Sequence, residues 1–439
     1  MNNKKLWLTV IIAFVVRGLL DAQVNSFNLP DQLTTLIKNA FDNYPKLKAG
    51  DATIRSTETQ HDLAKAGYLP TVDGDGTYRY QKPTPSLTFP GFGSFQFFPA
   101  NNYDFHVAAQ VPIWDFGRTQ TDVKKTFLEI QTSRDNLESV KQTLSYQVTE
   151  LYCAIVFYNK SIEVQNEQIN LLDSDINIIS ARVKDGDALN FDLLSTQVKR
   201  NNADNQLIDL ENSRKKDYEY LDMLTAQQGD GYITRDDITF DSKGHEDVSS
   251  DKNYDLLILN DQLRESEMDI KAARNNWLPK LTARGQLGYQ DGYIGTKEGG
   301  GLISINQLLL TGSVGVGLTV PIYGGDRPNY RTKIAQINLE AAKYNMETTK
   351  INVDKDILQA KSDLEATKGK LKNYESQIDQ AKEALNLAEI RYKAGVITNL
   401  ELLTSQTDLQ NAELGKIQLQ FSLLLSLIDL NRMGGTKLW

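Results

Sequence analysis

The chain of 439 residues has few of the residues from which disulfide frameworks and metal sites are built. Cys153 is its only cysteine, and its three histidines are His61, His106 and His245. A single cysteine excludes an intramolecular disulfide, and these residues cannot assemble a His/Cys metal site within one chain. We therefore expect no metal and no cofactor, and we interpret Cys153 as a small buried apolar residue.

Catalytic signatures and a basic surface are also missing. The sequence contains no P-loop, no HExxH motif, no GxSxG motif and no dinucleotide fingerprint. Its 48 Lys and Arg residues are outnumbered by 57 Asp and Glu residues, which gives a net charge of −9. This balance disfavours sequence-independent binding to nucleic acid. The sequence therefore predicts neither an enzyme nor a partner of nucleic acid.

Long apolar runs are absent as well. The N-terminus carries Lys4 and Lys5, then an apolar stretch of eleven residues at 6–16 that Thr9 alone interrupts, then small or polar residues near Ala22. That order is typical of a secretory signal peptide, and the apolar stretch is too short for a membrane-spanning helix. We predict a signal peptide at residues 1–22, with a short amphipathic anchor as the alternative. Beyond it no apolar run reaches about 18 residues, so any entry into a membrane would require strands.

The sequence does contain an internal repeat with a spacing of 209 residues. The phrase RVKDGDALNFDLLSTQ, which begins at Arg182, returns as RYKAGVITNLELLTSQ from Arg391. The same spacing separates YLP at 68–70 from WLP at 277–279, and VPIW at 111–114 from VPIY at 320–323. Landmarks that keep one spacing indicate two copies of one structural unit. We expect the first repeat at residues 23–225, a polar linker at 226–250, the second repeat at 251–433 and a C-terminal tail at 434–439.

Long segments of both repeats carry an apolar residue at every seventh position. The first series includes Val148, Ile155 and Ile162, and the second includes Ile357 and Leu364. A sustained seven-residue period is typical of a left-handed coiled coil. We expect long helices at about 115–185 and 190–224 in the first repeat, and at about 326–394 and 399–430 in the second.

The repeated phrase lies between the two long helices of each repeat and is interpreted as the tip of a helical hairpin. Gly186 and Gly395 follow the first helix of each pair, and glycine readily takes the left-handed conformation that ends a helix. An ordinary helix end without a binding partner is the alternative.

Short segments of alternating polarity occur at the opposite end of the long helices. Between residues 103 and 113 the odd positions are apolar, whereas the even positions include Asp104, His106 and Gln110. This alternation predicts strands with one apolar face. We expect strands at about 71–81 and 103–113 in the first repeat, and at about 281–290 and 311–322 in the second. Their length suits a tilted bilayer crossing, and a soluble sandwich with inward apolar faces is the alternative.

Aromatic residues and prolines mark the points where strands meet helices. The aromatics are Tyr68, Trp114, Trp277 and Tyr323, which have the positions of an interfacial girdle. The prolines are Pro70, Pro112, Pro279 and Pro321, which we expect to end the adjoining helix or strand. Four strands cannot close a barrel, and open edges in lipid leave backbone groups unpaired. Identical chains are therefore expected to complete the barrel together.

With these motifs in this order, the sequence resembles the TolC-type outer membrane factors, the outer membrane efflux protein family. The resemblance is carried by LP at the start of the strands, the tip phrase, and VPI followed by Gly117 and Arg118 or by Gly325 and Arg327. It implies a mainly α fold with a membrane β-barrel part. In that fold two repeats of a long helical hairpin and a two-stranded hairpin form a trimeric α/β barrel duct.

The resemblance also implies a function. Such a homotrimer is an outer membrane channel with its helical tunnel in the periplasm, and it belongs to a tripartite efflux pump or a type I secretion system. Its partners are outer membrane lipid, a periplasmic adaptor and an inner membrane pump of RND, ABC or MFS type. The alternatives are a trimeric cell-surface stalk or scaffold without channel activity, and a soluble adaptor, which has one helical hairpin where this chain has two.

The resemblance further implies the residues of a gate. Aligned on the tip glycine, Tyr392 matches the gating tyrosine of the family and Glu401 matches an acidic ring, and Asp408 lies one heptad further on. A negative ring favours cations, whereas a solvated helix face is the alternative for both carboxylates. The gating arginine of the family falls on Ile397 and its second aspartate on Thr404, which argues against an ion-pair lock. The implied adaptor-docking residues are Arg182, Gly186, Asp192, Arg391, Gly395 and Glu401.

Two segments between the predicted strands are candidates for extracellular loops. They cover residues 82–102 and 292–309, and the first is rich in Phe, Pro and Gly. We interpret the first segment as an ordered cap, with an unstructured loop as the alternative.

Overall fold

The computed structural model describes residues 29–84, 86–91, 93–96, 99–227, 233, 248–291 and 307–439. The predicted signal peptide lies outside these residues, as do most of the predicted linker and of the second predicted loop. The chain divides into two compact units, each of which contains segments of both repeats. We refer to them as the sheet unit (50–135 and 258–347) and the helical unit (described residues up to Ala49, 136–257 and 348–439).

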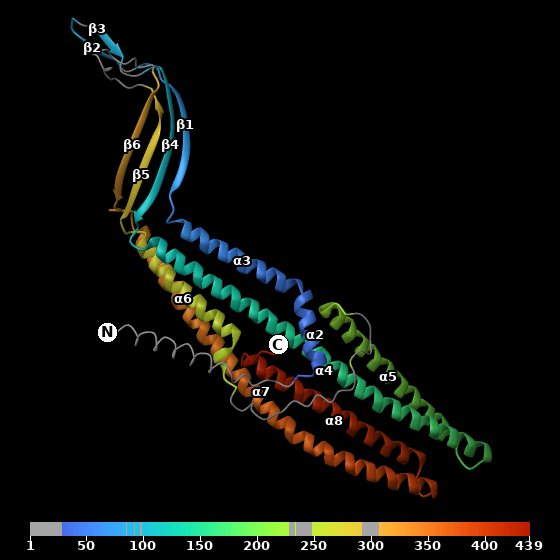
Figure 1. The fold of residues 1–439 in the computed structure, drawn as a ribbon. Coiled ribbons are helices and arrows are strands. Elements are labelled where there is room, and N and C mark those ends of the chain that lie inside the picture. Colours follow the sequence, from blue (N-terminus) through green and yellow to red (C-terminus); the bar gives the residue numbers. More distant parts are fainter. Residues whose placement is uncertain are drawn as a thin grey trace, which may run out of the picture. The chain divides into compact units, whose positions relative to one another are not determined.

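The sheet unit contains one four-stranded antiparallel sheet with the strand order β1-β4-β5-β6 (Figure 1). The strands are β1 (Thr71–Tyr80), β4 (Asn101–Trp114), β5 (Lys280–Gln290) and β6 (Leu309–Thr319). Helices α3 (Pro45–Ala66) and α6 (Tyr254–Asn275) precede β1 and β5, and helices α4 (Arg118–Asp185) and α7 (Arg327–Lys393) follow β4 and β6. Each repeat therefore has the order helix, strand, strand, helix.

The two strand hairpins have the same register. Thr71 lies opposite Gln110 in the first, and Lys280 lies opposite Thr319 in the second, so the two pairs are 209 residues apart like the sequence landmarks. The ladder between β4 and β5 joins the hairpins and leaves β1 and β6 as the two edges of the sheet. A smaller hairpin, β2 (Ser86–Phe89) with β3 (Gly93–Gln96), gives the first predicted loop regular structure.

The sheet has an apolar face and a polar face, because residues opposite each other in neighbouring strands share a face. One such row contains Val72, Ala109, Gly285 and Val314. Side chains on this apolar face are exposed, with Val72 at 64% and Val314 at 91%. A soluble sandwich would bury this face under a second sheet, so that alternative does not hold for the described residues.

The end of β6 differs from the prediction. The strand ends at Thr319 and not at residue 322, because Lys280, the first residue of β5, lies opposite Thr319. Among the residues that the structure describes, residues 320–323 consequently pair with no strand.

Pro112 does not end its strand as predicted, since β4 continues past it to Trp114. β1 begins opposite Gln110, so the last residues of β4 have a neighbouring strand on one side only. An edge of this kind tolerates a residue without an N–H group. The pairing with β5 shifts its register between Pro112 and Trp114.

The helical unit contains the remaining parts of α4 and α7 together with α2 (Asp31–Asn43), α5 (Asn190–Thr225), the 3-10 helix η1 (Ser250–Lys252) and α8 (Asn399–Met433). Helix α5 follows α4, and α8 follows α7, so each pair forms a helical hairpin (Figure 1). Heptad residues form the core, with Val148, Ile155 and Ile357 all buried. Within the described ranges, no helix combines the length and the apolar character required to cross a membrane.

The C-terminal residues pack onto the helical unit. Gln142 Nε2 of α4 donates to the carbonyl oxygens of Arg432 (3.2 Å) and Thr436 (3.3 Å). Leu438 is buried, and Trp439 packs edge-to-face on Phe41 of α2 with ring centroids 5.6 Å apart. These contacts hold the end of α8 against α4.

Candidate functional sites at the hairpin tips and on the sheet

Helices α4 and α7 end in the same way at the two copies of the repeated phrase. The N–H groups of Asp187 and Val396 donate to the carbonyl oxygens of Arg182 (2.8 Å) and Arg391 (2.9 Å) respectively. Gly186 and Gly395 precede these donors with φ of +82° and +72°. Such a closure over six residues with a left-handed glycine is a Schellman motif. A side chain with a Cβ is strained in this conformation, so both tips require glycine.

Helix α8 begins with a reciprocal capping box. Thr398 Oγ1 accepts a hydrogen bond from the N–H of Glu401 (3.3 Å), and the Glu401 carboxylate accepts one from the N–H of Thr398 (2.7 Å). The hydrogen bonds from the backbone and hydroxyl of Thr398 lower the pKa of Glu401. The predicted ring carboxylate therefore also holds the start of its own helix.

Arg182 and Tyr392, two residues that the sequence singled out separately, meet at the ends of α4 and α7. The Arg182 Cζ atom lies 5.4 Å from the centroid of the Tyr392 ring, which is a cation–π geometry. Desolvation raises the pKa of Tyr392, although the charge of Arg182 acts in the opposite direction. The phenol is therefore neutral, and its ring face is available to the guanidinium.

Buried amides connect α8 with the hairpin of α4 and α5. The side-chain nitrogens of Asn399, Gln406 and Gln410 donate to Thr196 Oγ1 (3.1 Å), Asp175 Oδ2 (2.8 Å) and Gln165 Oε1 (2.8 Å) respectively. Asn399 is 4% exposed, Gln406 is 2% exposed and Gln165 is 1% exposed. Burial raises the pKa of Asp175, and the bond from Gln406 opposes that effect. These bonds link the first-repeat hairpin to the second-repeat hairpin.

Sequence reasoning missed these amides, although a signal was present. Gln165 stands three residues after Ile162, at the heptad position that Leu151, Leu172 and Ile179 occupy elsewhere in α4. A polar residue at such a position indicates a specific partner across the helix interface.

The remaining positions that the sequence singled out near the tips lie on α5, α7 and α8 or just before α8. Asp408 and Thr404 are exposed on α8, and Ile397 is half-buried just before it. Arg391 is exposed, and Asp192 in the first turn of α5 accepts a hydrogen bond at its carbonyl oxygen from Asn399 (3.4 Å). Asp192 therefore contributes to the hairpin link through its backbone.

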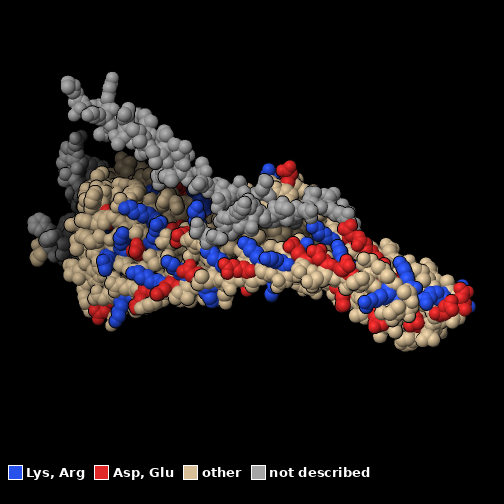
Figure 2. Space-filling view, turned by 90° about the horizontal axis from the view of Figure 1, so that it is seen from below, with Lys and Arg blue, Asp and Glu red and all other residues tan. Residues whose placement is uncertain are grey.

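Exposed apolar side chains at the tips are a second feature that the sequence analysis missed. Leu189 and Phe191 are 69% and 70% exposed at the first tip, and Val396 and Leu400 are 72% and 63% exposed at the second. Lys, Arg, Asp and Glu side chains of both signs are intermingled along the helices up to the hairpin ends in Figure 2. Exposed apolar residues surrounded by charges are typical of a protein-binding surface.

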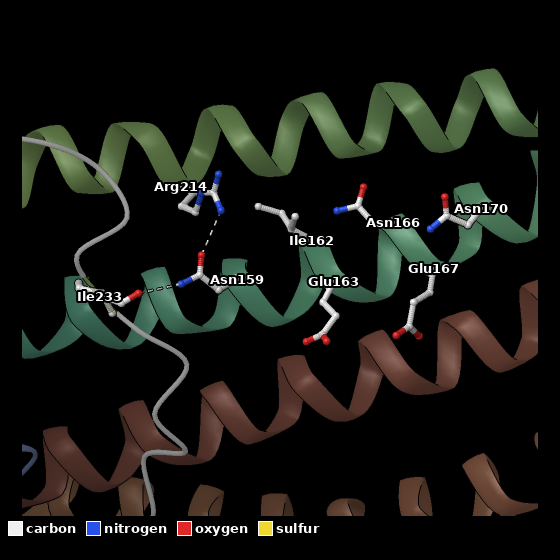
Figure 3. Close-up of a pocket in the computed structure, with 8 residues that line it drawn as sticks. All are labelled: Asn159, Ile162, Glu163, Asn166, Glu167, Asn170, Arg214 and Ile233. Atoms are coloured by element: carbon white, nitrogen blue, oxygen red, sulfur yellow. Dashed lines mark hydrogen bonds between the residues drawn. The ribbon is translucent and has the colours of Figure 1, made fainter.

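A hollow lined mostly by polar side chains lies between α4 and α5. Asn159, Asn166 and Asn170 of α4 line it, and Arg214 Nη1 of α5 donates to Asn159 Oδ1 (3.1 Å) (Figure 3). Among the described residues, no group of three or more His, Cys, Asp or Glu side chains is placed to hold a metal ion.

The sheet brings the four predicted aromatics to one end. Tyr68 and Trp277 precede β1 and β5, whereas Trp114 and Tyr323 lie at or beyond the ends of β4 and β6. Antiparallel pairing places all four of these strand ends together. Tyr68, Trp114 and Tyr323 are exposed, at 50%, 60% and 85%. Pro70 and Pro279 precede their strands directly, and Pro321 lies two residues beyond β6.

The polar face of the sheet carries charged groups. His106 Nδ1 lies 3.0 Å from Asp104 Oδ1, and His106 Nε2 lies 3.6 Å from Asp75 Oδ2. Arg284 Nη2 donates to Gln110 Oε1 (2.7 Å). A four-stranded sheet with one exposed apolar face and one charged face suits a wall between lipid and water.

The sequence matches the protein family described as "Outer membrane efflux protein" over residues 36–227 and 250–436, which is most of the chain. It is 22% identical over 405 residues to the alkaline protease secretion protein AprF of Pseudomonas aeruginosa, covering 87% of this chain and 80% of that protein.

Two solved structures share the fold. That of CusC has a TM-score of 0.80 at 15% identity and covers 94% of each chain. That of the outer membrane protein VceC of Vibrio cholerae has a TM-score of 0.77 at 18% identity, covering 93% of this chain and 97% of that one.

Proposed function

The chain belongs to the outer membrane efflux protein family, and on that premise we propose how it forms its conduit. It is an outer membrane channel-tunnel of an efflux pump or a type I secretion system. Members of the family are channels and not enzymes, and a stalk without channel activity is not supported. We propose that the duct is a homotrimer, with a barrel in the outer membrane and a helical tunnel in the periplasm.

The observation that carries this proposal is the pair of unlike faces on a sheet with two open edges. The apolar face, with Val72 and Val314, suits lipid, and the face with Asp75, Asp104 and His106 suits an aqueous lumen. Unpaired strand edges within a bilayer would cost several kcal/mol for each backbone group, so further copies must pair with β1 and β6.

A stripe along α7 supports the same assembly. Tyr330 and Ile337 in the sheet unit, and Ile351 and Leu358 in the helical unit, lie seven residues apart within each pair and are 54–68% exposed. An apolar stripe with a seven-residue period requires a partner helix. We propose that a second copy supplies this helix.

We propose that the paired tips form the closed gate. In place of an ion pair, the contact of Arg182 with Tyr392 and the buried amides hold the second hairpin to the first. Glu401 and Asp408 are proposed to give the opening a negative ring that favours cations. Glu401 would serve this ring and the capping box together.

We propose that the periplasmic adaptor docks at the same tips. The exposed apolar groups of Leu189, Phe191, Val396 and Leu400 supply contact area around the two Schellman glycines. The inner membrane pump, of RND, ABC or MFS type, would deliver substrate through that adaptor. Tip residues would then release their mutual contacts in favour of the adaptor.

Single-channel recording in a planar bilayer tests the proposed function. The purified chain should form SDS-resistant, heat-modifiable trimers from the outer membrane fraction and should conduct with a cation preference in a salt gradient. Asp408→Asn should lower that preference without loss of trimer. A chain that stays monomeric and gives no conductance in the bilayer would overturn the proposal.

A further inference from the structure

We propose that β6 and the first turns of α7 dock on β1 and the end of α3 of a second copy in one defined register. That register is the one that β4 and β5 adopt within the chain, and Arg327 takes the place that Arg118 has in the internal junction. This inference rests on the proposed function, because it specifies the contact by which copies complete the conduit.

The internal junction shows what the contact contains. Arg118 Nη2, at the start of α4, donates to the carbonyl oxygens of Asn275 (3.2 Å) and Asn276 (3.3 Å) at the end of α6. The terminal carbonyl groups of a helix lack intrahelical partners, and a cation is favoured there. Since α4 follows β4 and α6 precedes β5, this contact continues the β4–β5 ladder into the helices.

The repeat spacing generates a second junction of the same kind. Adding 209 to Arg118 gives Arg327 at the start of α7, and subtracting 209 from Asn275 and Asn276 gives Ala66 and Gly67 at the end of α3. The acceptors are backbone carbonyls, so the change of side chain does not remove them. Arg327, Ala66 and Gly67 are all exposed, whereas Arg118 is half-buried. Because β1 and β6 are opposite edges of one sheet, the two parts can meet only between copies.

The two acceptor helices also end alike. The N–H of Leu69 donates to the carbonyl of Ala66 (2.9 Å), and the N–H of Leu278 donates to that of Asn275 (3.0 Å). A carbonyl oxygen accepts two bonds, so Ala66 retains the capacity for a guanidinium that Asn275 uses.

The same spacing fixes the strand register. Within the chain Ala108 of β4 lies opposite Gln286 of β5. Adding 209 to Ala108 gives Gly317 of β6, and subtracting 209 from Gln286 gives Thr77 of β1. The equivalent register therefore places Gly317 opposite Thr77 of a second copy. Both residues belong to the polar face of their own sheet, so this register continues each face across the boundary. An offset of one residue would exchange the faces.

Exposed apolar side chains at the start of α7 are consistent with α3 of a second copy as the partner. Thr121 of α4 is 8% exposed and receives a hydrogen bond from Asn275 of α6 (2.8 Å). Its counterpart in α7, Tyr330, is 62% exposed, and Ile334 beside it is 58% exposed. Leu63 of α3 is 73% exposed and lies one turn before the proposed acceptors. A second copy that brings α3 to this side of α7 would cover these apolar groups together.

The end of β6 at Thr319 is also consistent with the proposed register between copies. β4 continues to Trp114 because β5 pairs with its last residues, whereas β6 stops at Thr319, where its partner β5 begins. In the proposed register, residues 320–322 gain β1 of the second copy as a partner. We expect β6 to extend over these residues in the assembled protein.

Disulfide trapping tests the register in the full chain. In a Cys153→Ala background, Thr77→Cys with Gly317→Cys should form disulfide-linked dimers and trimers on mild oxidation in isolated outer membranes. The matched control is Thr77→Cys with Ser313→Cys, which lies on the same face but about 13 Å further along the strand. Cysteines more than about 7 Å apart at Cα do not join, so the control should stay unlinked. Cross-linking of the control pair alone, or of neither pair, overturns the register.

A second measurement tests Arg327. The SDS-resistant oligomer of Arg327→Met should dissociate at a lower temperature than the native oligomer, and Arg331→Met, an exposed arginine one turn further along α7, should leave that temperature unchanged. Equal dissociation temperatures for all three proteins overturn the proposed role of Arg327. A conducting native trimer that fails these tests contradicts this interface alone, whereas a native monomer without conductance contradicts the proposed function.

Discussion

Arg182 lies over the ring of Tyr392 although the two residues are 210 positions apart, and their contact joins the last turn of α4 to the last turn of α7. An arginine at this place needs no acidic partner, because the face of an aromatic ring attracts a cation. The resemblance to the family places its charged gate residues at Ile397 and Thr404, which are uncharged here. In our proposal the contact of Arg182 with Tyr392 takes the place of an ion pair between the tips.

Loss of that contact should favour the open gate. A cation–π pair at a partly exposed site contributes about 0.5–1 kcal/mol, so Arg182→Ala should raise open probability in planar bilayers roughly two- to fivefold. Tyr392→Leu should have a similar effect, and the double variant should add little to either single change. Arg391→Ala, which removes the exposed counterpart arginine, serves as the control. Equal opening in the Arg391 and Arg182 variants would contradict this role.

Asn399 should contribute measurably to stability, because it is buried and donates to Thr196 and to the carbonyl of Asp192. Replacing it by alanine should lower the free energy of unfolding by about 1–2 kcal/mol in urea titrations. Asn190 is its counterpart one repeat earlier and is exposed, so Asn190→Ala should change that energy by less than about 0.5 kcal/mol. Similar losses for the two variants would argue against a link between the hairpins through Asn399.

The capping box of α8 should make stability depend on pH. Thr398→Ala should cost about 1 kcal/mol, and Thr398→Ser should preserve the cap. The hydrogen bonds from Thr398 lower the pKa of Glu401 from its ordinary value of 4.5. The Glu401 carboxylate therefore contributes its full stabilisation of the folded state above that ordinary value. This stabilisation is lost as the pH falls through the lower pKa of Glu401 in the folded state. Urea midpoints of the native chain and of Glu401→Gln should converge as the pH falls below 4.5, and a constant difference across that range would refute the cap.

The two faces of the sheet should respond differently to charge. Val314→Arg places a cation on the apolar face and should destabilise the membrane-embedded protein by about 2–4 kcal/mol, seen as a lower urea midpoint in lipid vesicles. Ser313→Arg places the same charge on the polar face of the same strand and should cost much less. Equal losses at the two positions would mean that the apolar face does not contact lipid.

Local periodicity explains why much of the fold was predictable. The heptads through Val148 and Ile357 indicate helices, and the alternation from residue 103 to 113 indicates a strand, because each period follows from the geometry of a few successive residues. The spacing of 209 residues then predicts that both halves repeat one arrangement. Gly186 and Gly395 each predict a helix end without further context, since few other residues tolerate their backbone conformation.

The end of β6 and the continuation of β4 past Pro112 were not predictable in the same way. Both depend on where a neighbouring strand begins, at Lys280 and at Thr71. The alternating polarity of one strand does not show where its neighbour begins. Pairing range is a property of two strands together, so it is settled only when the sheet forms.

The elements, their repeat and the glycine-ended tips could be predicted from the sequence, because they depend on short-range backbone geometry and on the period of apolar side chains. The contact of Arg182 with Tyr392, that of Asn399 with Thr196 and the exposure of the apolar face of the sheet became evident only from the folded chain. Such contacts join residues about two hundred positions apart, and their geometry is set by how whole helices and strands pack. A local pattern can indicate that a residue such as Gln165 has a partner across a helix interface, but it does not identify that partner.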